Sequence, residues 1–266
     1  APRVTVDIIG PAGGVVRQFS SDSAAAVELG TERLSTKGGF HRLVWDLKTT
    51  GPRVPRGVAT GFGGPGGGVK VSPGGYQVRV TAGVAVDARG FEVIGNPRAP
   101  SITQADYDEQ YRVAAAVRDT LNGIYAAIET IRSVRDQAKA ATDRVRAGGK
   151  PLGNLAALSD TLTARLGIVE GFLMPARATG ELASPTKLVG QYSTLYNTLV
   201  GDGGYGSGSA EGRPSAGRLQ RKADLDRQWA AVRPMLDRVL GEDLPSFNNE
   251  MGRLGAGGVI VPTRPK

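Results

Sequence analysis

The sequence predicts an α+β protein of two domains, an N-terminal β-sandwich followed by an antiparallel bundle of about four helices. In the N-terminal part, short stretches carry apolar residues at every second position, which is typical of strands. From Ser101 to Gly148 one long stretch has helical periodicity, and shorter helical stretches follow. A chain of 266 residues is long enough for two domains. We expect the sandwich at 1–97, the helical bundle at 98–255 and an extended tail at 256–266.

Composition excludes several classes of function. The chain has no cysteine, so disulfides, thiolate metal sites and cysteine nucleophiles are excluded. Its net charge is +8, divided evenly between residues 1–97 and the remainder, with +4 in each. A nucleic-acid-binding module concentrates its basic residues, so we expect no nucleic-acid partner. An anionic membrane surface or another protein stays open as a partner.

The first residues and the hydropathy of the chain indicate its expected cellular compartment. The chain begins Ala1-Pro2 without an initiator methionine, so we expect a processed product from which a signal peptide or a larger N-terminal part has been removed. No stretch approaches the ~20 apolar residues that a membrane-spanning helix needs, and we expect no transmembrane segment. Together with the lack of cysteine, this favours a periplasmic or secreted bacterial protein.

Alternation and turn residues locate the strands. Val4–Ile8 alternates apolar and polar residues, Gly10–Gly14 has turn chemistry, and Val15–Phe19 can return as the second strand of a hairpin. The later strands are expected at Leu43–Leu47, at Tyr76–Val80 and, after a turn at Ala88–Gly90, at Phe91–Val93.

Two segments resemble a known module. A strand ending in Trp45-Asp46, followed by a loop and then by Pro73–Val80 with the pattern Pro-Gly-x-Tyr-x-Val-x-Val, is similar to the immunoglobulin-like module of the flagellar hook-capping protein FlgD. The resemblance implies that Trp45 fills the sandwich core, that Asp46 anchors the following turn, and that Pro73-Gly74 sets the bend before the next strand.

Two glycine-rich segments interrupt the pattern, an insertion at 51–70 and a loop at 201–217. Each formally fits G-x-G-x-x-G, but a dinucleotide site needs a strand before this motif and a helix after it. We therefore interpret both segments as flexible connections and expect no cofactor. The glycines that fit the motif are Gly61, Gly63 and Gly66 in the insertion, and Gly201, Gly203 and Gly206 in the loop.

Capping residues and prolines delimit the helices. Thr103 and Asp106 resemble a broad capping box at the start of the long helix, although Ser101 could also be its cap, and Gly148 ends the helix. A second helix follows Pro151, and Pro234 should kink the last long helix. Further helix starts are expected at Ser184-Pro185 and Pro214-Ser215, and a short helix is expected at Ser246–Leu254.

No catalytic constellation is recognisable, so we predict no catalytic, cofactor-binding or metal-ligating residues. His41 is the single histidine, and its strand position favours a structural role. Asp106, Asp108 and Glu109 are interpreted as first-turn acids that favour a helix N-terminus, and Glu242-Asp243 as a solvated turn. Basic residues accumulate from Arg132 to Arg146, where we expect a projecting, positively charged helix end that serves as a contact surface.

The order of features resembles the C-terminal region of secreted bacterial sortilin/Vps10-like proteins with BNR-repeat β-propellers, which are often labelled glycosyl hydrolases. The segments that carry the resemblance are Gly39–Leu47, Pro73–Tyr76, Pro97-Arg98, Ile131–Arg135 and Asp243–Asn248. The family's Ser-x-Asp-x-Gly-x-Thr-Trp propeller boxes are missing from the sequence. The resemblance therefore implies the tail without the propeller, where any hydrolase chemistry would reside.

We expect a non-enzymatic, periplasmic or exported interaction module that acts as an accessory or scaffold subunit. Its partners would be other protein subunits of a larger assembly, such as a photosynthetic or secretion complex in a membrane. Two alternatives stay open. The chain could be a support domain or fragment of a carbohydrate-active enzyme, or its sandwich could bind carbohydrate.

Overall fold

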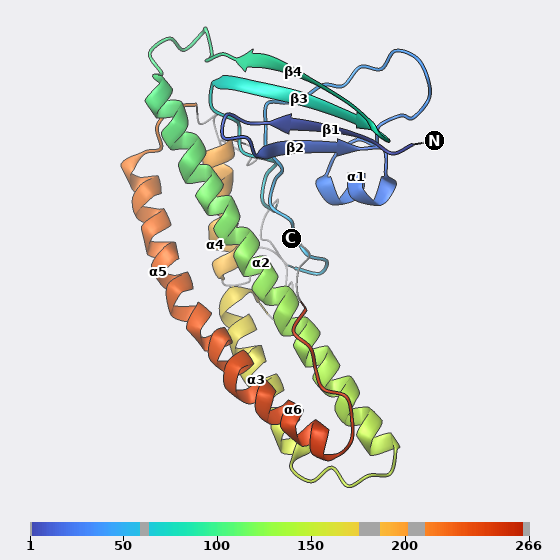
Figure 1. The fold of residues 1–266 in the computed structure, drawn as a ribbon. Coiled ribbons are helices and arrows are strands. Elements are labelled where there is room, and N and C mark those ends of the chain that lie inside the picture. Colours follow the sequence, from blue (N-terminus) through green and yellow to red (C-terminus); the bar gives the residue numbers. More distant parts are fainter. Residues whose placement is uncertain (1, 59–63, 176–186, 202–210, 263–266) are drawn as a thin grey trace. The chain divides into compact units, whose positions relative to one another are not determined.

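The computed structural model describes residues 2–58, 64–175, 187–201 and 211–262. It confirms a mixed α+β protein (Figure 1). The chain divides into two compact units, each built from several segments. The first unit comprises Ala1–Arg53, Pro65–Asp119 and Thr194–Leu219, and the second comprises Val54–Gly64, Thr120–Ser193 and Gln220–Lys266.

The first unit contains a four-stranded antiparallel sheet in the order β2-β1-β3-β4 (Figure 1). The predicted hairpin at its start is confirmed, because β1 pairs with β2 in antiparallel register with Val6 opposite Phe19. The strands are β1 (Val4–Ile9), β2 (Val15–Ser20), β3 (Gly74–Ala82) and β4 (Ala85–Val93).

The turn expected at Ala88–Gly90 is wrong, since β4 runs through these residues. The chain reverses earlier, at Gly83-Val84, between the paired residues Ala82 and Ala85. Gly83 has φ +61°, and a two-residue hairpin loop with glycine at its first position matches the twist of the strands it joins. Gly83 was the sequence signal for this turn.

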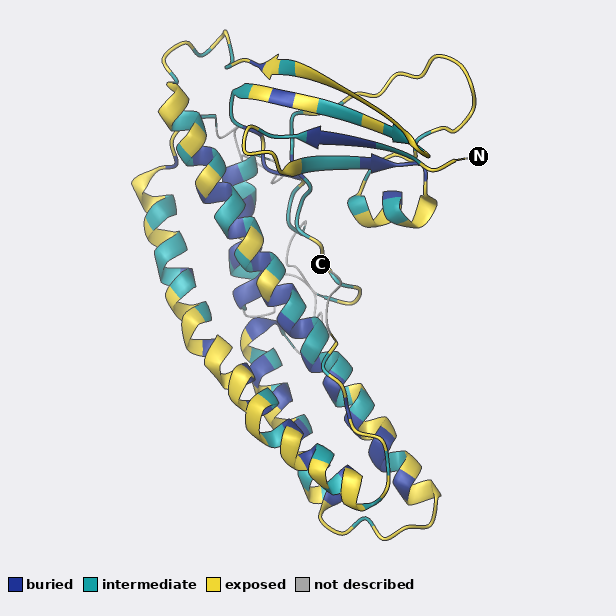
Figure 2. Cartoon of the chain, in the orientation of Figure 1, coloured by how far each residue is buried: buried dark blue, intermediate teal, exposed yellow. Residues whose placement is uncertain are grey.

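The two faces of the sheet differ in chemistry. One face is apolar, and Val6, Ile8 and Tyr76 belong to its buried cluster. On the other face, the Asp7 carboxylate is buried but accepts hydrogen bonds from Gln18 Nε2 at 2.7 Å and from Arg79 Nη2 at 2.7 Å. These bonds compensate the cost of burying the charge. Figure 2 shows β1 as the most deeply buried strand.

The apolar face is covered by loop residues and helix residues rather than by a second sheet. Trp45 packs against Tyr76 and Phe91, with ring centroids 5.8 and 6.1 Å apart, and Leu34 and Tyr111 pack on the same cluster. The described residues form no second sheet that would complete an immunoglobulin-like sandwich. Trp45 nevertheless contributes to the core, as expected.

The strand predicted at Leu43–Leu47 is also wrong. Leu47 has φ +59°, a left-handed conformation that a leucine adopts rarely and at a cost of about 1–3 kcal/mol. The Asp46 carboxylate accepts a hydrogen bond from the backbone N–H of Lys48 at 3.1 Å, and Trp45 Nε1 donates to the Lys48 carbonyl at 2.8 Å. The Trp-Asp segment is thus a turn, and Asp46 anchors it as predicted.

The end of the glycine-rich insertion packs closely against this turn. A Cβ added at Gly68 would lie 1.6 Å from the carbonyl oxygen of Thr49. Thr49 N–H donates to the Val69 carbonyl at 2.8 Å, and Val69 N–H donates to Thr49 Oγ1 at 3.1 Å. Gly68 and Val69 are therefore held in place by Thr49 and are not part of a flexible connection, while residues 59–63 of the insertion lie outside the described residues.

The helical segments largely follow the prediction. The long helix α2 (Gln104–Ala147) begins after a capping box in which Thr103 N–H donates to Asp106 at 3.0 Å. The short helix α1 (Ser23–Leu29), capped by Asp22, was not predicted. The remaining helices are α3 (Leu155–Leu173), α4 (Leu188–Val200), α5 (Ala216–Arg238), the π-helical turn η1 (Val239–Asp243) and α6 (Leu244–Arg253).

Some helical predictions stay open. Pro234 lies inside α5, and the π-helical turn η1 begins shortly after it. The helix start at Ser184-Pro185 and most of the loop at 201–217 fall outside the described residues. The arrangement of the helices as one antiparallel four-helix bundle stays a prediction.

Gly68→Ala should strongly destabilise the first unit, because the new methyl group can be accommodated only if the backbone of Thr49 moves. We expect a loss of about 3 kcal/mol or more in the free energy of unfolding, measured by urea denaturation. Gly75→Ala is the control, since its Cβ would have no neighbour within 4 Å. An equal, small effect of both substitutions would show that Gly68 is not constrained by Thr49.

Candidate interaction surface

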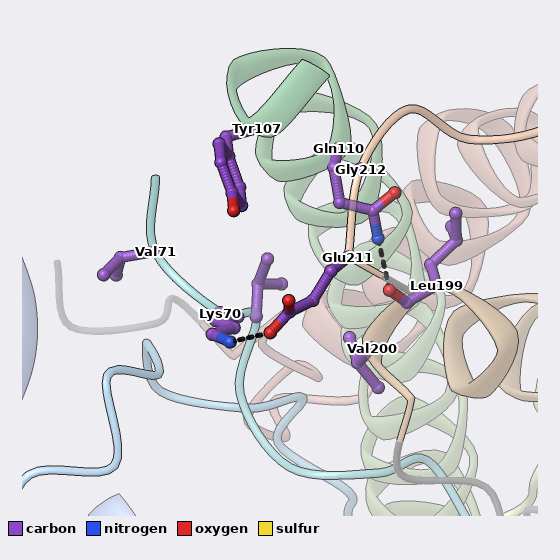
Figure 3. A pocket seen from close by; sticks show the side chains of 9 residues that line it. Lys70, Val71, Tyr107, Gln110, Leu199, Val200, Glu211 and Gly212 are labelled. Atoms are coloured by element: carbon purple, nitrogen blue, oxygen red, sulfur yellow. Dashed lines mark hydrogen bonds and ion pairs between the residues drawn. The ribbon is translucent and has the colours of Figure 1, made fainter. Parts of the chain in front are cut away.

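A small pocket in the first unit brings together charged, amide, aromatic and aliphatic side chains (Figure 3). Its volume is about 40 Å³, enough for water but too small for a sugar ring. Lys70 forms an ion pair with Glu211, and Gln110 Nε2 donates to the Leu199 carbonyl (Figure 3). The full lining is Val69, Lys70, Val71, Tyr107, Gln110, Leu199, Val200, Glu211 and Gly212.

The charges of this pocket are satisfied internally. Glu211 accepts hydrogen bonds from Lys70 and from Asn96 Nδ2, and these bonds hold the pKa of Glu211 below its ordinary value of 4.5. Such a carboxylate stabilises the fold at neutral pH, and this contribution is lost as the pH falls through its lowered pKa. The arrangement suits a structural ion pair better than a general base, which works best with a pKa near neutrality.

The residues that sequence analysis examined for catalysis lie apart from one another. His41 is exposed, and its Nε2 donates to the Lys37 carbonyl at 2.7 Å. Asp106 caps α2 and, with Glu109, holds Arg213 at 3.2 and 2.9 Å. In the parts of the chain that are described, no group of three or more histidine, aspartate or glutamate side chains could hold a metal ion.

Glu242-Asp243 is not the solvated turn that was expected, because both residues lie in η1. Asp243 is largely buried and accepts from Arg165 Nη1 at 2.6 Å, whereas Glu242 forms an exposed pair with Arg238 at 3.0 Å. The π-helical turn directs the Asp243 side chain toward the interior. No simple sequence pattern predicts such a turn.

The basic end of α2 also differs from the prediction. Arg132 and Arg135 both bind the Glu170 carboxylate, at 2.7 and 2.9 Å. Lys139 and Arg146 both pair with Asp143. The buried stripe of the helix continues through Val134, Ala138, Ala141 and Val145, so this end does not project. Small alanine side chains pack closely but contribute little to a hydrophobic pattern, so the sequence did not predict that this end is buried.

Among the basic residues of this segment, Arg144 makes no ion pair with any described residue. It lines an open pocket of about 160 Å³ together with Lys150 and Met251. Lys150 Nζ donates to the Leu254 carbonyl at 2.8 Å, so this amine already has a partner. Fewer basic side chains at the end of α2 are therefore available to contact a partner than the sequence predicted.

A different segment of the first unit is exposed along its whole length. Ser35–Val44, here called the Phe40 loop, follows α1, and all of its residues are exposed (Figure 2). Phe40 is 96% exposed and Val44 71%. The loop also carries Lys37, His41 and Arg42 and has no acidic residue. Contiguous exposed apolar side chains of this kind mark interaction sites more often than catalytic ones.

The exposure of this segment was not predicted, because Leu43 and Val44 fit the alternating pattern of a strand. The signal lay in Gly38-Gly39, since Gly39 has φ +125° and lets the chain turn outward.

None of the described helices has an apolar run of membrane-spanning length.

Comparison of the chain with protein-family models, with curated proteins and with solved structures finds no match.

Glu170→Gln should destabilise the second unit, because two largely buried guanidinium groups would lose their shared charge partner. Glu170 is only 14% exposed, so we expect a loss of about 2 kcal/mol in the free energy of unfolding. Glu242→Gln, which breaks the exposed pair with Arg238, should cost about 0.5 kcal/mol or less. Denaturant titration of both variants checks this, and equal losses would contradict the assignment of Glu170 as the organising anion.

Proposed function

We propose that the protein is a non-enzymatic interaction module, periplasmic or exported, that serves as an accessory or scaffold subunit of a larger assembly. The observation that carries this proposal is the Phe40 loop, in which Phe40 and Val44 are exposed and Lys37 and Arg42 form no ion pair with a described residue. The neighbouring fold uses its charges internally, in pairs such as Lys70–Glu211 and Arg79–Asp7. A surface that is costly to expose is readily explained by a partner that covers it.

The composition of the loop favours a protein partner with an apolar pocket and an acidic rim. Aromatic and arginine side chains are enriched where partners bind most strongly, and Phe40 and Arg42 are close neighbours in the loop. Lys37 and Arg42 would add long-range attraction to an acidic partner and raise the association rate. A membrane protein complex with a periplasmic face remains part of the proposal.

The kinship with the C-terminal region of sortilin/Vps10-like BNR-repeat proteins, including an immunoglobulin-like sandwich, also remains a proposal. It is supported by the position of Trp45 in the core and by the turn that Asp46 anchors. A separate protein that carries a β-propeller of this family could be the partner that binds the Phe40 loop. The alternatives of a carbohydrate-active enzyme fragment or a carbohydrate-binding sandwich have no comparable support, since the pocket in the first unit is of water size.

The test is site-specific photo-crosslinking in the cells that produce the protein. A crosslinking amino acid at Phe40 should capture a defined protein partner, whereas the same amino acid at Ile168, which is 57% exposed on α3, should not. Phe40→Ser should reduce co-purification of that partner about tenfold or more, with stability unchanged because the ring makes few internal contacts.

Three outcomes would contradict the proposed function. The first is a chain that always runs alone in native complexes, and the second is equal capture from Phe40 and Ile168. The third is a glycosidase activity of the isolated chain that is lost on substitution of His41, which would favour the enzyme alternative.

A further inference from the structure

Strand β4 presents an edge with which no described strand pairs. In the sheet order β2-β1-β3-β4, β4 pairs with β3 on one side and with no described strand on the other. Residues 85–90 are exposed, and Figure 2 shows most of β4 as exposed. An edge of this kind is a ready template for pairing with another chain.

The register identifies the backbone groups that point outward. The two-residue turn makes Ala82 and Ala85 a closely hydrogen-bonded pair, and bonded and non-bonded pairs alternate from there along an antiparallel ladder. The outward groups of β4 therefore belong to Val86, Ala88, Gly90 and Glu92. Independent support comes from Ala88, whose N–H donates to the Asp87 carboxylate at 2.9 Å, as an amide without a strand partner would.

We infer that this edge pairs with the same edge of a second copy of the chain, in antiparallel orientation about a two-fold axis at Ala88. Ala88 then faces its counterpart, and each Val86 faces Gly90 of the other copy. Each of these pairs consists of outward-pointing residues, so each can exchange both N–H···O bonds. The two sheets would join into one continuous sheet.

Charge complementarity selects this register. With the axis at Ala88, Asp87 of each copy lies opposite Arg89 of the other, and residues opposite each other in an antiparallel pair share a face. Both side chains are exposed, at 70% and 80%, and within one chain they lie 3.7 Å apart. An axis at Val86 or Gly90 also matches the hydrogen-bond pattern but pairs neither charge with an opposite one. Asp87 and Arg89 themselves point their backbone groups toward β3, which excludes an axis there.

The interface is small. Pairing one strand of each copy buries less than the roughly 1,200 Å² that stable interfaces bury, so the dimer should depend strongly on protein concentration. We expect association in the micromolar range or weaker. The inference does not depend on the proposed function, because it concerns β4 and not the Phe40 loop.

The first experiment is sedimentation velocity of the full chain over a wide concentration range. Wild-type protein should shift from monomer to dimer with concentration. Arg89→Asp places like charges opposite each other at two positions and should weaken the dimer about tenfold or more. Arg42→Asp, an equal change of charge in the exposed Phe40 loop, should leave the dimer unchanged. Circular dichroism checks that each variant is folded.

The second experiment mixes two charge variants. Asp87→Arg protein carries arginine at 87 and 89, and Arg89→Asp protein carries aspartate at both, so each should be monomeric alone but form a mixed dimer with the other. Ala88→Pro removes an outward N–H without affecting the β3 ladder, and it should abolish dimers of either kind.

Several results would overturn the inference. They are a wild-type chain that stays monomeric throughout, a dimer that survives Ala88→Pro, and a mixture of the charge variants that does not associate. Binding of an extended segment of another protein to β4, with the chain itself remaining monomeric, would assign the edge to that partner and would also overturn it.

Discussion

Thr49 joins its own segment to the segment around Val69 and to α2. Its backbone N–H donates to Val69, and its hydroxyl accepts from the Val69 N–H at 3.1 Å and from Arg118 Nη1 of α2 at 2.9 Å, while donating to the Thr50 carbonyl at 3.1 Å. The residue is 2% exposed, so each of these groups would be costly to leave without a partner. Gly68 completes the junction because only a residue without a side chain fits against the Thr49 carbonyl.

The contacts around Thr49 hold in place the loop residues that cover the apolar face of the single sheet. Leu47 and Val71 are linked by a backbone hydrogen bond at 2.8 Å, and both pack on the apolar face of the sheet with Trp45. The left-handed backbone of Leu47 costs free energy, and the contacts around Thr49 and Trp45 offset it. Because the cover is held at its end near Thr49, the preceding Phe40 loop can lie outside the core without unfolding the unit. In the proposed function, the Phe40 loop binds a partner while the core of the first unit stays folded.

The sequence was most informative where local chemistry and tertiary structure agree. The β1–β2 hairpin, the capping box at Thr103 and the position of α2 follow from alternation, capping and helical period. Prediction failed where a single backbone conformation or a distant partner decided the outcome. Leu47 alternates with its neighbours as a strand residue would, but its positive φ makes a turn. Arg132 and Arg135 look free in the sequence, since Glu170, which binds them, lies on another helix.

The candidate surfaces were the least predictable part. Exposure of Phe40 cannot be read from periodicity, because the same residues would suit a buried strand. The open edge of β4 depends on the order of strands in the sheet, which alternation does not specify. The predicted domain boundary at residue 97 remains a hypothesis about the fold, and the resemblance to the tail of propeller proteins remains a hypothesis about the partner.

Amide hydrogen exchange, measured by NMR on the wild-type chain and on Thr49→Val, tests the central claim most directly. In the wild type, the Val69 amide should be protected as strongly as the amides of β1, while the amides of residues 36–44 should exchange at nearly unprotected rates. Thr49→Val keeps the shape but removes the hydroxyl acceptor, so Val69 should lose protection by about 1–3 kcal/mol. A Val69 amide that exchanges as fast as that of Phe40 in the wild type, or one that is unaffected by the substitution, would contradict the account.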